Sequence, residues 1–282
     1  MWSKRLRASA SKKEEMEMFS PALRPVDFVL SIAAFACASA LATASPTFAQ
    51  AAPAHWSYSG DHGPSHWGDL EPDYATCSEG KHQSPIDIKD AKKDISLAPL
   101  QFDYKAVPLK VINNGHTIQI NYDSGSSVTV GGERYPLIQF HFHKPSEEEI
   151  AGTKYDMVIH LVHKLGDRLL VVGVLVKTGA ENPMIKTLWA NLPATEGKES
   201  EVAGVTINAA NLLPRDRNYY TFDGSLTTPP CSEGVRWYEI KTAIHFSAAQ
   251  VAAFAKIYPM NARPIQPSNG RKISESEFKT SP

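Results

Sequence analysis

Four histidines in two neighbouring segments are the residues of this 282-residue chain best suited to metal chemistry. In the segment Gln-Phe-His-Phe-His, His141 and His143 are two residues apart, so in a strand both imidazoles point to the same face. Catalytic zinc typically takes three protein ligands and keeps the fourth position for water. The next segment offers His160 and His163 as the third ligand. These two face opposite sides of a strand, and periodicity alone does not choose between them.

The elements that must position these histidines are predicted to be short strands. Segments rich in Val, Ile and aromatic residues are separated by Asn-Gly, Ser-Gly-Ser, Gly-Gly and Gly-Asp turn signals. Consecutive strands joined in this way pair antiparallel in the simplest topology. The expected strands are 109–112, 117–122, 127–130, 134–143, 156–163 and 168–177.

Helix signals are few. Ser247-Ala-Ala-Gln250 is a capping box that begins a helix running to Tyr258, where Pro259 stops it, and a shorter helix is expected near 182–192. Residues 55–108 are rich in Gly, Pro and Asp, which favours ordered irregular structure. The expected fold is a mixed α+β, sheet-dominated single domain around a large twisted, mostly antiparallel central β-sheet with few short helices.

The first 51 residues have the layout of a signal peptide. A basic beginning is followed by an Ala-rich apolar stretch over 28–44 and then by small residues. We predict that 1–51 is a removed leader, that 52–282 is the functional domain, and that the protein is periplasmic or secreted. A permanent membrane anchor is the alternative, but Ser31, Ser39 and Thr43 interrupt the stretch. No membrane span is expected in the mature chain.

Cysteine content agrees with export. Of three cysteines, Cys37 lies in the leader, which leaves Cys77 and Cys231 as an even pair in a compartment where disulfides persist. Two separate buried thiols are the alternative.

Charge and composition restrict the partners. The formal net charge is -1, which gives no electrostatic reason to expect a nucleic acid, an anionic membrane surface or a polyanionic substrate. A small neutral ligand fits better.

Motifs over 55–267 resemble the alpha class of carbonic anhydrases, especially exported bacterial members. The resembling segments are His55-Trp-Ser-Tyr58, Gly63-Pro-Ser-His-Trp67, Gln83-Ser-Pro-Ile-Asp-Ile88, Asn113-Asn-Gly-His116, Gln139-Phe-His-Phe-His143, Ser146-Glu147, His160-Leu-Val-His163, Gly224-Ser-Leu-Thr-Thr-Pro-Pro230 and Asn261-Ala-Arg-Pro264. The resemblance assigns zinc (Zn2+) to His141, His143 and His160. It leaves His163 as a structural or surface histidine.

The resemblance implies reversible hydration of carbon dioxide to bicarbonate and a proton, with ester hydrolysis as a side activity. Thr227 matches a gatekeeper threonine that donates its hydroxyl proton to a buried carboxylate, here Glu147, and Thr228 matches a contact to bicarbonate. His116 matches a histidine that carries the proton to buffer, for which an imidazole pKa near 6.5 is suited. Taken alone, these residues would be an ordinary turn threonine, a solvated carboxylate and a surface histidine. A rival reading is a binding module of this family without catalysis, but such relatives usually lose zinc histidines.

Further positions follow from the same resemblance. The apolar pocket for carbon dioxide is expected from Val162, Val171, Leu226, Val235 and Trp237, and the water chain from Tyr58, Asn114 and Gln119. Cis peptide bonds are expected at Ser84-Pro85 and Pro229-Pro230, and a disulfide between Cys77 and Cys231. The sequence leaves the oligomeric state open between a monomer and a homodimer, the form that bacterial relatives often take.

The outer partners of the ligands show one departure from the family. By resemblance Gln139 holds His141, and the backbone carbonyl of Asn261 holds His143. The third ligand usually has a Glu two residues before it, but Val158 stands there, and Glu148 replaces a histidine expected to touch that Glu. We hypothesise that Glu148 reaches the free nitrogen of His160. The alternative is that Glu148 is solvated and His160 uses water.

Overall fold

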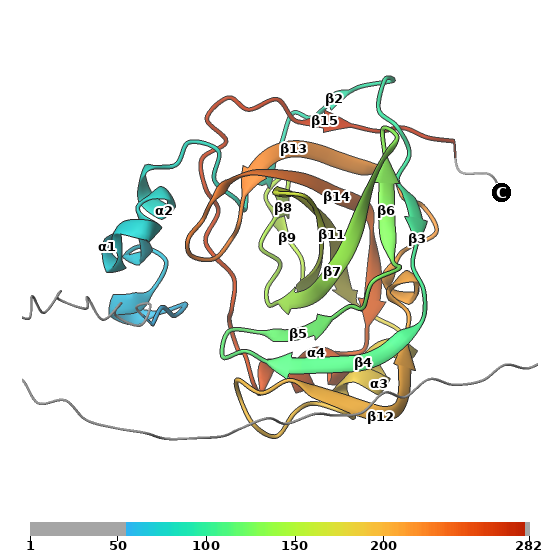
Figure 1. The fold of residues 1–282 in the computed structure, drawn as a ribbon. Helices are drawn as coiled ribbons and strands as arrows, with labels where there is room; N and C mark the ends of the chain where they lie inside the picture. Colours follow the sequence, from blue (N-terminus) through green and yellow to red (C-terminus); the bar gives the residue numbers. More distant parts are fainter. Residues whose placement is uncertain (1–54, 280–282) are drawn as a thin grey trace, which may run out of the picture. The chain divides into compact units, whose positions relative to one another are not determined.

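The computed structural model describes residues 55–279 (Figure 1). The predicted leader, 1–51, and Cys37 within it lie outside the described residues. Within 55–279 no helix is both long and apolar enough to cross a membrane.

A large sheet dominates the described chain (Figure 1). Its main path runs β12-β4-β5-β7-β10-β11-β14-β13-β15-β2, with β3 and β6 attached through β7. The strands of this sheet are β2 Lys92–Lys93, β3 Gln101–Asp103, β4 Val107–Asn113, β5 Ile118–Asn121, β6 Ser127–Val130, β7 Glu133–His143, β10 Met157–Leu165, β11 Arg168–Thr178, β12 Ser200–Ile207, β13 Tyr219–Ser225, β14 Glu233–Phe246 and β15 Ser274–Glu275. A small second sheet contains β1 Asp87–Ile88, β8 Glu149–Ile150 and β9 Thr153–Lys154.

The predicted fold class is confirmed. The six expected strands correspond to β4, β5, β6, β7, β10 and β11, with ends that differ by a few residues. Most neighbouring strands are antiparallel, but β11 pairs with β14 in parallel. The expected antiparallel pairing of consecutive strands is confirmed for β4 with β5, β6 with β7 and β10 with β11. Strand β14 pairs in parallel because it arrives from a distant part of the chain and not through a hairpin. Strands β12, β13 and β14 were not anticipated.

Helices are short, as predicted. They are η1 Gly60–His62, α1 Trp67–Leu70, η2 Pro72–Tyr74, α2 Thr76–Glu79, α3 Pro183–Trp189, η3 Ala209–Leu212 and α4 Ala248–Ala255. The capping box of α4 is confirmed: the backbone N–H of Gln250 donates to Ser247 Oγ at 3.2 Å, and Gln250 Oε1 accepts from Ser247 N at 2.9 Å. The helix ends at Ala255, before the predicted end at Tyr258.

The alternation of strand β7 separates a core from a candidate site. Phe140 and Phe142 are fully buried in the main apolar core, while His141 and His143 between and after them point to the other face. Strand β10 continues this pattern, since Ile159 belongs to the same core. Burial of the apolar face thus fixes which face the histidines take, because a shift of one residue would exchange the two sets.

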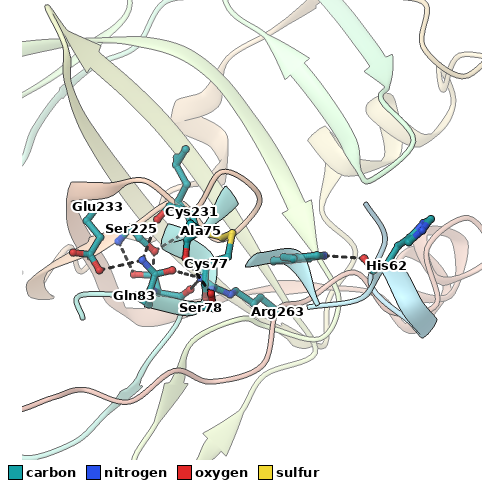
Figure 2. The surroundings of a disulfide bond; sticks show 12 residues. His62, Ala75, Cys77, Ser78, Gln83, Ser225, Cys231, Glu233 and Arg263 are labelled. Carbon is teal, nitrogen blue, oxygen red and sulfur yellow. Dashed lines mark hydrogen bonds between the residues drawn. A yellow bond between two sulfur atoms is a disulfide. The ribbon is translucent and has the colours of Figure 1, made fainter. Parts of the chain in front are cut away.

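The segment before β3 is mostly irregular, as expected, and is tied to the sheet by a disulfide (Figure 2). Cys77 and Cys231 are bonded with an S–S length of 2.06 Å, so the predicted pairing is confirmed and the two-thiol alternative is wrong. The cysteines pack with Trp67 in a small separate apolar cluster. The predicted cis bonds at Ser84-Pro85 and Pro229-Pro230 are present, with a third at Lys144-Pro145.

Candidate metal centre and its cavity

Strand register brings three histidines together. His141 on β7 lies directly opposite His160 on β10, and His143 follows two residues later on the same face. Each of these three residues offers one ring nitrogen, and the three nitrogens all lie within 4.8 Å of one another. Two adjacent strands therefore supply a three-histidine set of the kind that catalytic zinc takes.

Hydrogen bonds decide which ring nitrogens face the metal position. Nδ1 of His141 is 2.8 Å from Gln139 Oε1, and Nδ1 of His143 is 2.7 Å from the backbone carbonyl oxygen of Asn261. These contacts leave Nε2 free on both rings. Nε2 of His143 is buried and has no hydrogen-bond partner among the described residues.

The third histidine is oriented the opposite way. Nε2 of His160 is 3.3 Å from Glu148 Oε2, which leaves Nδ1 toward the other two rings. Glu148 is fully buried, so the alternative that it is a solvated charge is wrong. This contact is the one hypothesised from the sequence, in which Glu148 reaches the nitrogen of His160 that the Val158 side chain cannot accept from. Two Nε2 atoms and one Nδ1 atom, each on a ring whose other nitrogen is engaged, fit a zinc ion.

Burial keeps the ligands in the form that binds metal. Burial lowers the pKa of His141 to about 3, with a smaller contribution from His160. Burial also lowers the pKa of His143 well below its usual value. Both imidazoles are therefore neutral at neutral pH, and a neutral ring nitrogen can donate its lone pair to a metal.

His163 points away from the other three. It is fully buried, its Nε2 is 2.7 Å from the hydroxyl of Tyr104, and its Nδ1 is 3.3 Å from the carbonyl oxygen of Leu170. It is a structural core histidine, and the surface alternative is wrong. A shift in register between Val162 and His163 accompanies this change of environment.

Glu147 lies beside the ligand nitrogens. Its Oε1 accepts a hydrogen bond from the backbone N–H of Arg263 at 2.8 Å, and its Oε2 is 3.4 Å from Nε2 of His143. It is fully buried, so the solvated alternative is wrong for this carboxyl group too. Burial raises the pKa of Glu147 to about 7 and Glu148 adds to the rise, while His160, the Thr227 hydroxyl and the Arg263 N–H oppose it. Thr227 is itself buried, and its hydroxyl lies near enough to lower the pKa of this carboxyl group.

A cavity of about 120 Å³ opens from the histidines. The residues expected for the water chain and for proton transfer line it together with two of the ligands. Its lining residues are Trp56, Tyr58, Asn114, His116, Thr117, Gln119, Gln139, His141, His143 and Thr228. The side chains of Asn114 and Gln119 are 3.4 Å apart, with the amide nitrogen of Asn114 donating.

The expected apolar pocket residues lie together on the same side of the sheet as His160. Val162, Val171, Val235 and Trp237 belong to one buried apolar cluster, against which Leu226 packs. The ring of His160 meets that of Trp237 edge to face, with centroids 4.8 Å apart. One side of the histidine set is therefore polar and the other apolar.

Trp56 is a functional candidate that the sequence did not single out. Its ring stacks on that of His116, with centroids 3.6 Å apart and planes 8° from parallel. His55 lies edge-on to the same imidazole at 5.9 Å. Both lie in the irregular segment, where no periodicity indicates which side chains point inward.

Comparison with known proteins identifies one family whose members match most of this chain. The family described as eukaryotic-type carbonic anhydrase matches residues 62–277. The chain is 42% identical over 234 residues to a carbonic anhydrase of Nostoc sp., covering 81% of this chain and 88% of the relative. It is 44% identical over 222 residues to one of Pectobacterium carotovorum, covering 78% and 90%.

A solved structure gives the same result. The alpha-carbonic anhydrase of Thermovibrio ammonificans, in complex with the inhibitor sulfanilamide, is 45% identical with a TM-score of 0.75, covering 78% of this chain and 99% of that one. This chain belongs to the eukaryotic-type, or alpha, carbonic anhydrase family.

Proposed function

We propose that this protein is a zinc-dependent enzyme for the reversible hydration of carbon dioxide to bicarbonate and a proton, with zinc held by His141, His143 and His160. The observation that carries the proposal is the set of three ring nitrogens within 4.8 Å of one another. When bound, zinc would act as a Lewis acid that makes water a nucleophile near neutral pH, as it does in carbonic anhydrases in general.

Thr227 and Glu147 orient the water that attacks. The Thr227 hydroxyl donates to the buried carboxylate of Glu147, so its oxygen is left to accept a hydrogen bond from that water. The Arg263 N–H donates to Oε1 of the same carboxylate at 2.8 Å, and Oε2 has no hydrogen-bond partner among the described residues, so it is the oxygen left for Thr227. The water therefore has one preferred orientation, and its lone pair is directed at the substrate carbon.

Substrate and proton take different sides of the cavity. Carbon dioxide carries no charge and no hydrogen-bond donor, so the cluster around Val162, Val171 and Trp237 suits it. The side chain of Thr228 borders the polar side, where bicarbonate would be held. His116 accepts the released proton through waters near Tyr58, Asn114 and Gln119 and passes it to buffer.

A hydration assay on zinc-loaded and zinc-free protein tests the proposal. Stopped-flow measurement with a pH indicator should show carbon dioxide hydration by the zinc-loaded protein only. His143→Ala should lose both zinc and activity, whereas His66→Ala, at an exposed histidine, serves as the matched control. Absence of hydration by the fully zinc-loaded parent would support a binding module without catalysis.

Ester hydrolysis is proposed as a side activity of the same site, because an activated water attacks any carbonyl carbon that reaches it. An activated aryl ester should be cleaved by the zinc-loaded protein and not by His143→Ala. Equal cleavage by both proteins would assign the esterase activity elsewhere.

Export to the periplasm or the medium, with removal of 1–51, is proposed from the leader layout and is supported by the disulfide. N-terminal sequencing of protein recovered from the periplasmic fraction should find a chain that begins near residue 52. Sedimentation of that mature protein distinguishes a monomer from a homodimer.

A further inference from the structure

The buried segment 261–263 touches both a metal ligand and the carboxyl group beside the ligands. It belongs to no helix or strand, yet all three of its residues are buried. The carbonyl oxygen of Asn261 is 2.7 Å from Nδ1 of His143, and the N–H of Arg263 donates to Glu147 Oε1 at 2.8 Å. Because the segment has no ladder of backbone hydrogen bonds, its side chains must keep these two contacts in place.

The side chain of Asn261 fastens the first contact to strand β7 and its surroundings. Its Oδ1 accepts from the backbone N–H of Lys144 at 2.7 Å. Its Nδ2 donates to the carbonyl oxygens of Phe142 and His116 at 2.9 and 3.0 Å. The beginning of the segment is therefore tied to the strand that carries the ligand His143.

The guanidinium of Arg263 fastens the second contact to a different part of the chain (Figure 2). Its Nη1 donates to Gln83 Oε1 and to the carbonyl oxygen of Ser84, and its Nη2 donates to the carbonyl oxygen of Cys77, each at 2.8 Å. It also lies over the ring of Trp67, 5.6 Å from the centroid. All four partners come from the segment before β1.

Burial of this arginine requires an explanation. Arg263 is 1% exposed, the acceptors of its Nη atoms are neutral groups, and its Nε has no hydrogen-bond partner among the residues 55–279. Burying a charge is costly, and a well-packed apolar side chain is often at least as stable. A guanidinium differs from an apolar side chain in one useful way: its planar fork binds several acceptors at once in a fixed geometry. Such a side chain fixes the backbone from which it projects.

We propose that Arg263 is a positioning residue: its guanidinium fixes the backbone N–H of residue 263 against Glu147 Oε1, and thereby fixes the carboxylate that orients the attacking water. This inference rests on the proposed function, which supplies the role of Glu147. The two ends of the segment then have separate tasks. Asn261 keeps the ligand His143 in place, and Arg263 keeps Glu147 in place.

Arg263→Lys tests the guanidinium. A lysine keeps the positive charge, but its single nitrogen on a flexible stem cannot hold three acceptors in a fixed geometry. Gln83→Met is the second variant, because it removes one acceptor and leaves Arg263 itself unchanged. Its effects should have the same direction and be smaller.

Arg271→Lys is the matched control. Like Arg263, this arginine fastens irregular backbone near the disulfide, but its hydrogen bonds reach no residue of the proposed site. They go to the backbone carbonyl oxygens of Gln83, Asp223, Pro267 and Ser268. A loss of stability without a change in turnover is therefore expected for this variant.

The first readout is kcat/KM for hydration by zinc-loaded protein. Arg263→Lys should lower it about tenfold, less than the roughly 100-fold that a 1 Å misplacement can cost. In the Glu147→Gln background the same substitution should have little effect, because the route through the carboxylate is already removed. Equal losses in the two backgrounds, or an equal loss in Arg271→Lys, would overturn the proposal.

The second readout is zinc release to a chelator. Release from Arg263→Lys and Arg271→Lys should stay within about twofold of the parent, because the ligands keep their own outer partners. Release from Arg263→Lys that rises as much as kcat/KM falls would show a general loosening of the site, and the assignment to Glu147 would be wrong.

The third readout is hydrogen exchange of the backbone amide of residue 263, followed by NMR in the zinc-free protein. Relative to the amides of β11, which report opening of the whole sheet, this amide should exchange about tenfold faster in Arg263→Lys and at the parent rate in Arg271→Lys. Unchanged exchange in Arg263→Lys would overturn the proposal. If the zinc-loaded parent does not hydrate carbon dioxide, it is the proposed function that fails, and the exchange result still decides whether the guanidinium holds this N–H.

Discussion

Two walls of the same cavity are built in different ways. The metal-binding wall comes from neighbouring strands, in which His141 and His160 are opposite each other in register. The opposite wall includes Trp56 and Tyr58, from a segment of short helices and turns before the first long strand. Backbone pairing holds the first wall, while a disulfide and buried side-chain contacts tie the second to the sheet.

Arg263 is the connection between the two walls (Figure 2). Its guanidinium donates to the carbonyl oxygen of Cys77 and to the side chain of Gln83, each at 2.8 Å. Its backbone N–H donates to Glu147, beside the metal ligands. A sheet can therefore position ligands by register alone, whereas an irregular segment needs specific cross-links to keep its side chains in place.

The largest expected effect is on the cross-linked wall. Cys77→Ser/Cys231→Ser opens a bridge that joins residues 154 apart in sequence. The chain-entropy estimate for such a loop is about 5 kcal/mol as an upper value. At roughly 2–4 °C per kcal/mol for a chain of this size, calorimetry should show a melting temperature lower by on the order of 10 °C.

Zinc release should change far less in that variant, because the ligands lie on paired strands. A reductant should lower the melting temperature of the parent to that of the double variant and leave the variant itself unchanged. A large increase in the rate of zinc release in the double variant, alongside its lower melting temperature, would show that the two walls form one structural unit. The comparison between the walls would then be wrong.

The next effect tests the metal-binding wall. Glu148→Ala should speed zinc release to a chelator by about 10–100-fold, the range for loss of a ligand's outer partner. Gln139→Ala should fall at the low end of that range, because a neutral amide acceptor makes a weaker hydrogen bond than a buried carboxylate. Faster zinc release from Gln139→Ala than from Glu148→Ala would contradict this order of effects. The control Glu201→Ala, at an exposed carboxylate on β12, should release zinc at the rate of the parent.

A smaller effect is expected where the walls meet, at His116. His116→Ala should lower kcat about tenfold in dilute buffer, below the usual range for acid–base groups because water and buffer also carry protons. The ratio kcat/KM should hardly change, since it does not include the transfer to buffer. Added imidazole should restore kcat, and His66→Ala should behave as the parent. Equal losses in kcat and kcat/KM without rescue would exclude the shuttle role.

The smallest effect concerns the pKa of that imidazole. Burial lowers the pKa of His116 from its usual value near 6.5, and His55 lowers it further. Because the neutral form accepts the proton, the lowered pKa keeps the shuttle available at more acidic pH. An NMR titration of the His116 ring should therefore give a value below 6.5.

Two variants compare the causes of this shift. Trp56→Ala uncovers the stacked ring and His55→Ala removes the neighbouring imidazole, so both should raise the pKa of His116, the first by more. A fall in either variant would contradict the stated causes.

Local patterns in the sequence were enough to predict several features of the fold. The period of two placed His141 and His143 on one face, turn signals marked six strands, and the capping box marked the beginning of α4. Strands beyond Thr178 were missed, because charged residues and glycine within them, such as Gly204 in β12 and Glu239 in β14, weaken the strand pattern. Motif resemblance, and not periodicity, indicated His160 as the third ligand.

Contacts between distant segments became visible only in the folded chain. The pairing of β7 with β10 brings His160 opposite His141, and burial beside Tyr104 removes His163 from the metal position. Glu239 falls in the same row of the sheet as His160 only because β14 pairs with β11 in parallel at Gly173. Such register is set by long-range burial of apolar faces, and no local window of the sequence contains both partners.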